Sequence, residues 1–202
     1  MNNRLFFCIL LVWTSISLTA FSLYAQPNTS KAQSGLYLTA EDYQNGKLTL
    51  PATRGESHKI RLKDFWGSRY LEVVHGGQKY RFHKDSIYAY QDYKGKVFRF
   101  FRNYSNEFLL LESKSLVIYS MDETDTKGKG VRRVTLYFFS TDLKQPVQPL
   151  TIENVKNAFP QNHKLHNELD KYFKKDQELV VYDDRHKAFR INHVLESVLP
   201  QH

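Results

Sequence analysis

The chain has 202 residues, 41% of them hydrophobic and 25% charged, which leaves room for one compact domain with a sizeable core. Its net charge is +8, but the basic residues are scattered and form no arm-like run. This pattern argues against a nucleic-acid partner and favours either a solvated surface or contact with an anionic envelope component.

The first 25 residues have the layout of a secretory signal peptide. Arg4 is followed by an apolar run over residues 5–13, a more polar continuation and a small residue, Ala25, after which we expect cleavage. The alternative is an uncleaved membrane anchor, although hydroxyl residues interrupt the run that a spanning helix needs. Cleavage leaves no transmembrane segment and removes Cys8, the only cysteine, so disulfides and thiolate sites are excluded.

Residues 26–35 are polar and predict a flexible leader before a domain that covers residues 36–202. Thr39 and Asp42 have the spacing of a helix N-terminus, and Gly46 is a stop signal, so we expect one or two helical turns there. Pro51 and Gly55 then mark a connection.

From about residue 57 to residue 140 the hydrophobic period is two, which is typical of strands, beginning with "HKIRLKD". A Gly76-Gly77 turn predicts a hairpin in which Val73 opposes Tyr80, Leu71 opposes Phe82, His75 opposes Gln78 and Glu72 opposes Arg81. This register sorts the apolar pairs to one face and the charged pair to the other.

Two further hairpins follow. A three-residue loop at residues 93–95, with Gly95 in the left-handed region, would pair Tyr90 with Phe98 and Tyr88 with Phe100. A turn at Ser113-Lys114 would pair Leu111 with Leu116 and Leu109 with Ile118. Residues 121–130 predict a charged loop, and "VRRVTLYFFS" predicts the strand that closes the sheet.

After residue 148 the period becomes helical. Thr151 is a predicted cap for "TIENVKNAF", and the next segment places Leu165, Leu169, Tyr172 and Phe173 on one buried stripe. The segment "DQELVVYDD" predicts a short helix or turn. Asp184 is a predicted cap for a last helix that buries Ile191, Val194, Leu195, Val198 and Leu199.

Residues 36–148 are thus mostly strands and residues 149–202 mostly helices. We expect an α+β fold, with an antiparallel sheet or partly closed barrel of about six to eight strands and two or three C-terminal helices packed on it.

The stretch His75-Gly76-Gly77 matches the sequence with which the oxyanion-hole loop of many esterases begins. No Gly-x-Ser-x-Gly occurs in the chain, and a third glycine is missing, so we interpret the stretch as a turn. Neither Asp183-Asp184 nor the acids of residues 121–130 have a spacing that fixes a catalytic geometry.

Two groups of residues are candidates for binding. His163, His166 and Asp170 share one side of a helix and could bind zinc in a metal-dependent hydrolase, or they could form an ordinary solvated face. His186, His193 and Arg190 share the polar face of the predicted last helix. The aromatic residues Tyr88, Tyr90, Phe98 and Phe100 could bind a carbohydrate or a peptide, or they could form part of the hydrophobic core.

Several stretches resemble a group of small secreted proteins of Bacteroidetes-type bacteria. They include "GLYLTAEDYQNGKL", "IYAYQDYKGKVFRFF", "LYFFS" and "YDDRHKAFRIN", and the resemblance covers about residues 35–192. It implies export in a Gram-negative cell and a β-rich domain with helical C-terminal segments, and it assigns no site residue.

We therefore expect a periplasmic or extracellular protein with a binding or structural role in the envelope, no cofactor and no chemistry of its own. The alternatives are the aromatic-lined carbohydrate or peptide binder and the metal-dependent hydrolase.

Overall fold

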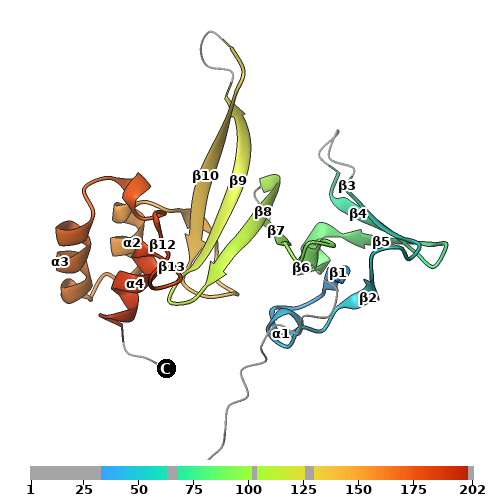
Figure 1. Cartoon of the computed structure of the whole chain (residues 1–202), viewed down its shortest axis with the longest axis horizontal. Helices are drawn as coiled ribbons and strands as arrows, with labels where there is room; N and C mark the ends of the chain where they lie inside the picture. Colours follow the sequence, from blue (N-terminus) through green and yellow to red (C-terminus); the bar gives the residue numbers. More distant parts are fainter. Residues whose placement is uncertain (1–32, 63–67, 102–103, 126–129, 200–202) are drawn as a thin grey trace, which may run out of the picture. The chain divides into compact units, whose positions relative to one another are not determined.

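The computed structural model describes residues 33–62, 68–101, 104–125 and 130–199 (Figure 1). The predicted signal peptide and most of the predicted leader lie outside these ranges. The first strand begins at Ser34, within the last two residues of that leader. Among the described helices, none has both the length and the apolar character needed to cross a bilayer.

An eight-stranded antiparallel sheet organises the chain, in the order β11-β10-β9-β8-β7-β6-β1-β2. Its strands are β1 (Ser34–Tyr37), β2 (Thr49–Ala52), β6 (Ala89–Gln91), β7 (Val97–Phe101), β8 (Tyr104–Ser113), β9 (Val117–Asp125), β10 (Arg132–Ser140) and β11 (Gln148–Pro149). The sheet is open, and the four α-helices lie mostly after it in the chain, so the predicted α+β class is confirmed.

The predicted short N-terminal helix is α1 (Ala40–Gln44). Thr39 and Asp42 form a capping box, in which each side chain accepts the other's backbone N–H, and Gly46 follows the helix with a positive φ of 62°. Both the start and the stop signal are confirmed.

The Gly76-Gly77 hairpin lies in a separate three-stranded sheet of β3 (His58–Leu62), β4 (Tyr70–His75) and β5 (Gln78–His83). The predicted register is confirmed, with Val73 opposite Tyr80. The two glycines have φ values of 56° and 79°, as a type I′ turn requires. Glu72 also forms an ion pair with Arg61 of β3, at 3.2 Å.

The second hairpin, between β6 and β7, is also confirmed. Gly95 has a φ of 77°, its N–H donates to the Asp92 carbonyl, and Tyr90 lies opposite Phe98. The predicted pairing of Tyr88 with Phe100 on the same face does not form. The chain bends at Tyr88, before β6 begins, and its ring joins a different core cluster from that of Tyr90.

The register predicted for the third hairpin is wrong. Leu109 lies opposite Ser120 and Ser113 opposite Val117, and the register shifts between Leu110 and Glu112. The turn occupies residues 114–116 in place of Ser113-Lys114, because the backbone of Leu116 is hydrogen-bonded to a buried asparagine, Asn192, near the C-terminus. Residues 121–125 are also not a loop, because β9 continues through them and pairs with β10 as far as Asp125. Nor does β10 close the sheet, since β11 pairs along its other edge.

The C-terminal region contains α2 (Ile152–Ala158) and α3 (His163–Tyr172), with Thr151 capping α2 as predicted. Leu165 and Leu169 are fully buried, but Tyr172 is 45% exposed and does not belong to the stripe. A single 3-10 turn, η3 (Asp176–Glu178), follows α3.

The last helix, α4 (Arg190–Glu196), begins later than predicted and is not capped by Asp184. Instead, β12 (Tyr182–Asp183) and β13 (Ala188–Phe189) form a small hairpin before it. The carboxylate of Asp183 accepts the backbone N–H groups of Arg185 and His186, which stabilises a turn where the period alone suggested helix.

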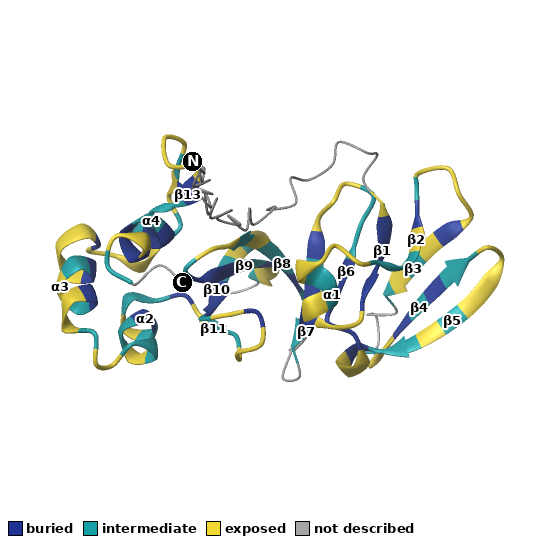
Figure 2. Cartoon of the chain, turned by 90° about the horizontal axis from the view of Figure 1, so that it is seen from below, coloured by how far each residue is buried: buried dark blue, intermediate teal, exposed yellow. Residues whose placement is uncertain are grey.

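The two faces of the large sheet carry different cores. Face A contains Leu109, Ile118 and Ser120, and face B contains Phe108 and Tyr119, because successive residues of a strand alternate sides. At one end of face A, helices α2, α3 and α4 turn their buried sides to the sheet (Figures 1 and 2). At the other end, the three-stranded sheet covers Leu36, Tyr90, Phe98 and Phe100.

A buried asparagine fastens the last helix to the sheet. Asn192 is 0% exposed, and its Oδ1 accepts the Leu116 N–H at 2.7 Å, while its Nδ2 donates to the Leu116 carbonyl at 3.1 Å and to Glu112 Oε1 at 3.2 Å. All the hydrogen-bonding groups of this contact are therefore satisfied inside the protein.

Substitution of Asn192 by Ala should lower the free energy of unfolding by about 2–3 kcal/mol, because the buried Leu116 N–H loses its partner and Glu112 loses a donor. Urea denaturation measures this loss. Asn167→Ala, at an exposed position of α3, is the control and should change stability little. Equal stabilities of the two variants would contradict this role for Asn192.

His58 joins the three-stranded sheet to β1 and contacts His75 within that sheet. His58 Nδ1 lies 3.2 Å from His75 Nδ1, and His58 Nε2 lies 3.4 Å from Ser34 Oγ. Burial lowers the pKa of His58 below its usual value of 6.5, and the charge on His75 lowers it further, while Glu56 acts weakly in the other direction. The pair shares a hydrogen bond only while at least one ring is neutral.

We expect the contribution of His58 to the free energy of unfolding to be fully present above about pH 6.5. It should fall as the pH decreases toward the folded-state pKa of His58, because His58 binds a proton more readily in the unfolded chain than in the folded one. Denaturation midpoints at pH 7.5 and 5.0 should differ less for His58→Gln than for the wild type. His163→Gln, at an exposed site, should retain the wild-type difference. A His58→Gln variant with the full pH dependence would rule out this explanation.

Candidate functional site

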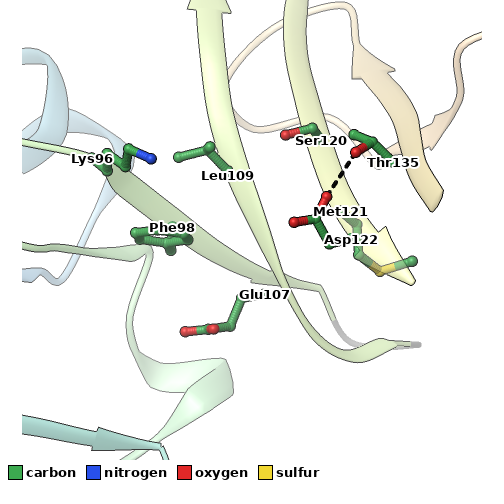
Figure 3. A pocket seen from close by; sticks show the side chains of 8 residues that line it. All are labelled: Lys96, Phe98, Glu107, Leu109, Ser120, Met121, Asp122 and Thr135. Atoms are coloured by element: carbon green, nitrogen blue, oxygen red, sulfur yellow. Dashed lines mark hydrogen bonds between the residues drawn. The ribbon is translucent and has the colours of Figure 1, made fainter. Parts of the chain in front are cut away.

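The candidate site is a hollow of about 490 Å³ on face A, shown in Figure 3. The ladder between β8 and β9 runs from the hairpin only as far as Leu109 and Ser120. Before Leu109, β8 pairs with β7, and beyond Ser120, β9 pairs with β10. The lining consists of Lys96, Phe98, Glu107, Leu109, Ser120, Met121, Asp122 and Thr135.

Strand alternation explains why these residues share a hollow. Phe98 lies opposite Leu109, Leu109 lies opposite Ser120, and Asp122 lies opposite Thr135, so one row of side chains crosses four strands on the same face. The apolar pair Phe98 and Leu109 forms part of the wall, and hydroxyl and carboxylate groups surround it.

Neighbouring hydroxyl groups orient both carboxylates of the hollow. Thr135 Oγ1 donates to Asp122 Oδ1 at 2.8 Å, and the Tyr90 hydroxyl donates to Glu107 Oε1. A carboxylate can accept about four hydrogen bonds, so Asp122 retains acceptor capacity in a fixed direction. Lys96 contributes a donor to the same lining.

The aromatic residues predicted from the sequence divide between core and hollow. Tyr90 is 7% exposed and stacks on Phe98 with ring centroids 5.0 Å apart, and it also contacts Phe100 at 5.9 Å. Phe98 is half-buried and lines the hollow. Tyr88 belongs to the core of face B, so the structure brings together three of the four residues. Of these, Phe98 lines the hollow, and Tyr90 reaches it through its hydrogen bond to Glu107.

The predicted metal ligands have other partners. His166 Nε2 lies 3.1 Å from the Lys156 carbonyl and 3.0 Å from the Phe159 carbonyl, so the ring caps the end of α2. Asp170 accepts a hydrogen bond from Lys156 Nζ at 2.6 Å, which lowers the pKa of its carboxyl. His163 packs edge-on against His166. Across the described part of the chain, no three histidine or acidic side chains gather as a metal site would require.

The other two histidines do come together, although not on one helix as predicted. His186 lies in the turn between β12 and β13, and its ring stacks on that of His193 in α4, with centroids 3.7 Å apart. His186 Nδ1 also lies 2.6 Å from Asp183 Oδ2, beside a shallow hollow of about 420 Å³ that includes Arg190.

Sequence reasoning did not find the hollow on face A. Its polar residues lie on β8, β9 and β10 and in the turn before β7. The sequence analysis also assigned Asp122 to a predicted loop over residues 121–130. The one available signal was the two-residue period, which continues through "SMDET" and places Ser120 and Asp122 on the same face.

Comparisons with protein families, with curated proteins and with solved structures found no match.

The Asp183 carboxyl provides a direct test of the histidine turn. Its pKa is lowered to about 2, mainly by the hydrogen bond from the His186 side chain and then by the backbone N–H groups of His186 and Arg185. The stabilisation that this carboxylate contributes is present above its usual value of 3.8 and is lost as the pH falls through about 2.

In His186→Ala, the pKa of Asp183 should rise toward 3.8 and stop short of it, because the backbone N–H groups remain. A carboxyl ¹³C titration by NMR measures the shift, with His163→Ala as the control that leaves Asp183 unchanged. An unaltered Asp183 titration in His186→Ala would exclude the imidazole as the main cause.

Proposed function

We propose that this chain is an exported, non-catalytic binding protein and that it binds a carbohydrate in the hollow on face A. Export is supported by the charged start, apolar run and small residues of the first 25 residues. A carbohydrate presents apolar C–H groups beside pairs of hydroxyl groups, and it therefore needs apolar contact together with hydrogen-bond acceptors and donors.

The observation that carries the proposal is the pair of oriented carboxylates beside an apolar contact surface. Glu107 and Asp122 are each held by a hydroxyl of the protein, and Phe98 and Leu109 lie in the same lining. Carboxylates fixed in this way can accept hydrogen bonds from sugar hydroxyls without first losing side-chain freedom. The volume, about 490 Å³, falls within the range of small-ligand pockets.

The charges of the lining favour a carbohydrate over an anionic ligand. The lining contains two carboxylates and one lysine, on a chain whose net charge is +8. A peptide is the competing ligand, and a basic one would match the acidic groups. A basic peptide would bind in the hollow through ion pairs, which salt weakens. A neutral sugar would bind through hydrogen bonds, which salt screens little.

The test is binding to an array of soluble oligosaccharides, followed by calorimetry of the best ligand. Asp122→Ala should weaken binding at least tenfold, because a hydrogen bond to a charged group contributes about 1.5–3 kcal/mol. Glu123→Ala is the matched control, since Glu123 is the exposed neighbour whose side chain points to face B.

Two results would overturn the proposal. One is the absence of binding to any oligosaccharide, with or without binding of a basic peptide. The other is a carbohydrate that Asp122→Ala and Glu123→Ala bind equally well.

A further inference from the structure

A second cavity, of about 540 Å³, lies next to face B and contains a buried arginine. It is bordered by the start of α1, by the 3-10 turn η2 (Lys84–Ser86), by β7 and by the segment of residues 143–144. Arg99 of β7 lines it and is only 7% exposed. None of its lining residues lines the hollow on face A, so the two sites are distinct.

Aromatic rings hold the Arg99 side chain in place. The guanidinium carbon lies 4.1 Å from the centroid of the Tyr88 ring and 4.5 Å from that of Phe101. Nη1 donates a hydrogen bond to the Tyr119 hydroxyl at 2.5 Å. The group is therefore oriented by its surroundings before any ligand arrives.

The charge of Arg99 is not balanced by a carboxylate. Among the described residues, no acidic side chain forms an ion pair with Arg99, and neither Arg99 Nε nor the Tyr88 hydroxyl has a hydrogen-bond partner. A buried charge without a counter-charge is strongly unfavourable, and cation–π contacts of about 1–2 kcal/mol offset only part of that.

The nearby acids form no ion pair with Arg99. Asp142 Oδ1 accepts the backbone N–H groups of Lys144 and Gln145, at 2.6 and 2.9 Å. Asp85, on the cavity wall, has its Oδ2 3.6 Å from His83 Nδ1. Neither carboxylate neutralises the guanidinium.

A lysine adds positive charge to the same cavity, and part of its wall is apolar. Lys84 and Lys144 line it together with Arg99, and Ile87, Phe100 and Leu143 form apolar wall. Arg99, which has no ion-pair partner among the described residues, and Lys144 at the rim give the cavity positive charge beside this apolar wall.

We propose that this cavity binds a small apolar molecule that ends in a carboxylate, with Arg99 as the anchor of the carboxylate. The planar guanidinium can donate two parallel hydrogen bonds to a carboxylate, and its unpartnered Nε is one of the donors available for that. The ligand's apolar part lies against Ile87, Phe100 and Leu143, and Lys144 attracts the anion at the rim. This inference does not depend on the carbohydrate proposal.

The experiment is titration of the full-length chain with octanoate, with 1-octanol and with inorganic phosphate, followed by calorimetry and by thermal denaturation. Octanoate and octanol share an apolar tail and differ in the charged group. We expect octanoate to bind at least tenfold more tightly than octanol and to raise the midpoint of thermal unfolding. Preference for inorganic phosphate, or equal binding of octanoate and octanol, overturns the proposal.

Substitutions separate an anchor from a merely structural arginine. Arg99→Lys keeps the charge but not the planar fork, and should weaken octanoate binding at least tenfold. Arg99→Met should abolish octanoate binding while leaving thermal stability unchanged or raised, because it removes an unbalanced buried charge. A structural arginine would give a less stable Arg99→Met protein and no effect of octanoate on the wild type.

A rim variant keeps the test valid if the Arg99 variants do not fold. Lys144→Gln should weaken octanoate binding about threefold, and the effect should shrink in high salt. Lys94→Gln, in the exposed turn between β6 and β7, is the control and should bind as the wild type does. Equal affinities for these two variants count against the proposal.

Discussion

The strict alternation of side chains along β9 is the constraint on which the rest of the structure depends. Tyr119 and Met121 enter the core of face B, and Ile118 enters the helix-covered core of face A. Ser120 and Asp122 also point to face A, but into the hollow. A slip of one residue would exchange these sets, burying a carboxylate and exposing a tyrosine, so one register satisfies both cores and the hollow together.

Polar groups inside the protein follow two different patterns. The Asn192 amide and the His58 ring have partners on other elements, and they join the last helix and the small sheet to the main sheet. Arg99 is as deeply buried but lacks a counter-charge among the described residues. A buried polar group whose hydrogen bonds are satisfied stabilises one packing arrangement, whereas an unsatisfied one destabilises it. On this basis Asn192 and His58 have structural roles, and Arg99 is the candidate for ligand binding.

The two hollows lie in different electrostatic surroundings. On face A, two carboxylates held by hydroxyl groups lie in the lining, and next to face B, the buried Arg99 and the rim residue Lys144 lie beside apolar wall. β7 contributes to both, since Phe98 points to one and Arg99 to the other. Two successive residues of one strand therefore line two different sites, one with carboxylates and one with a buried cation. The net charge of +8 gives no indication of this arrangement.

The sequence by itself determined the elements whose signals are local. The glycine turns at Gly76-Gly77 and at Gly95, the capping box of Thr39 and Asp42 and the Thr151 cap are all formed as predicted, because each depends on backbone angles and hydrogen bonds within a few residues. The change of the hydrophobic period from two to the helical value near residue 148 likewise predicted the helical region.

Only the tertiary structure decided the features that depend on distant partners. The β8–β9 turn shifted because Asn192, 76 residues later in the sequence, binds Leu116, and the bend at Tyr88 moved its ring to the other face. His166 caps the end of α2, since the packing of α2 on α3 offers its ring two carbonyl groups. These features depend on the energy of contacts between segments far apart in the chain, which cannot be predicted from a local sequence pattern.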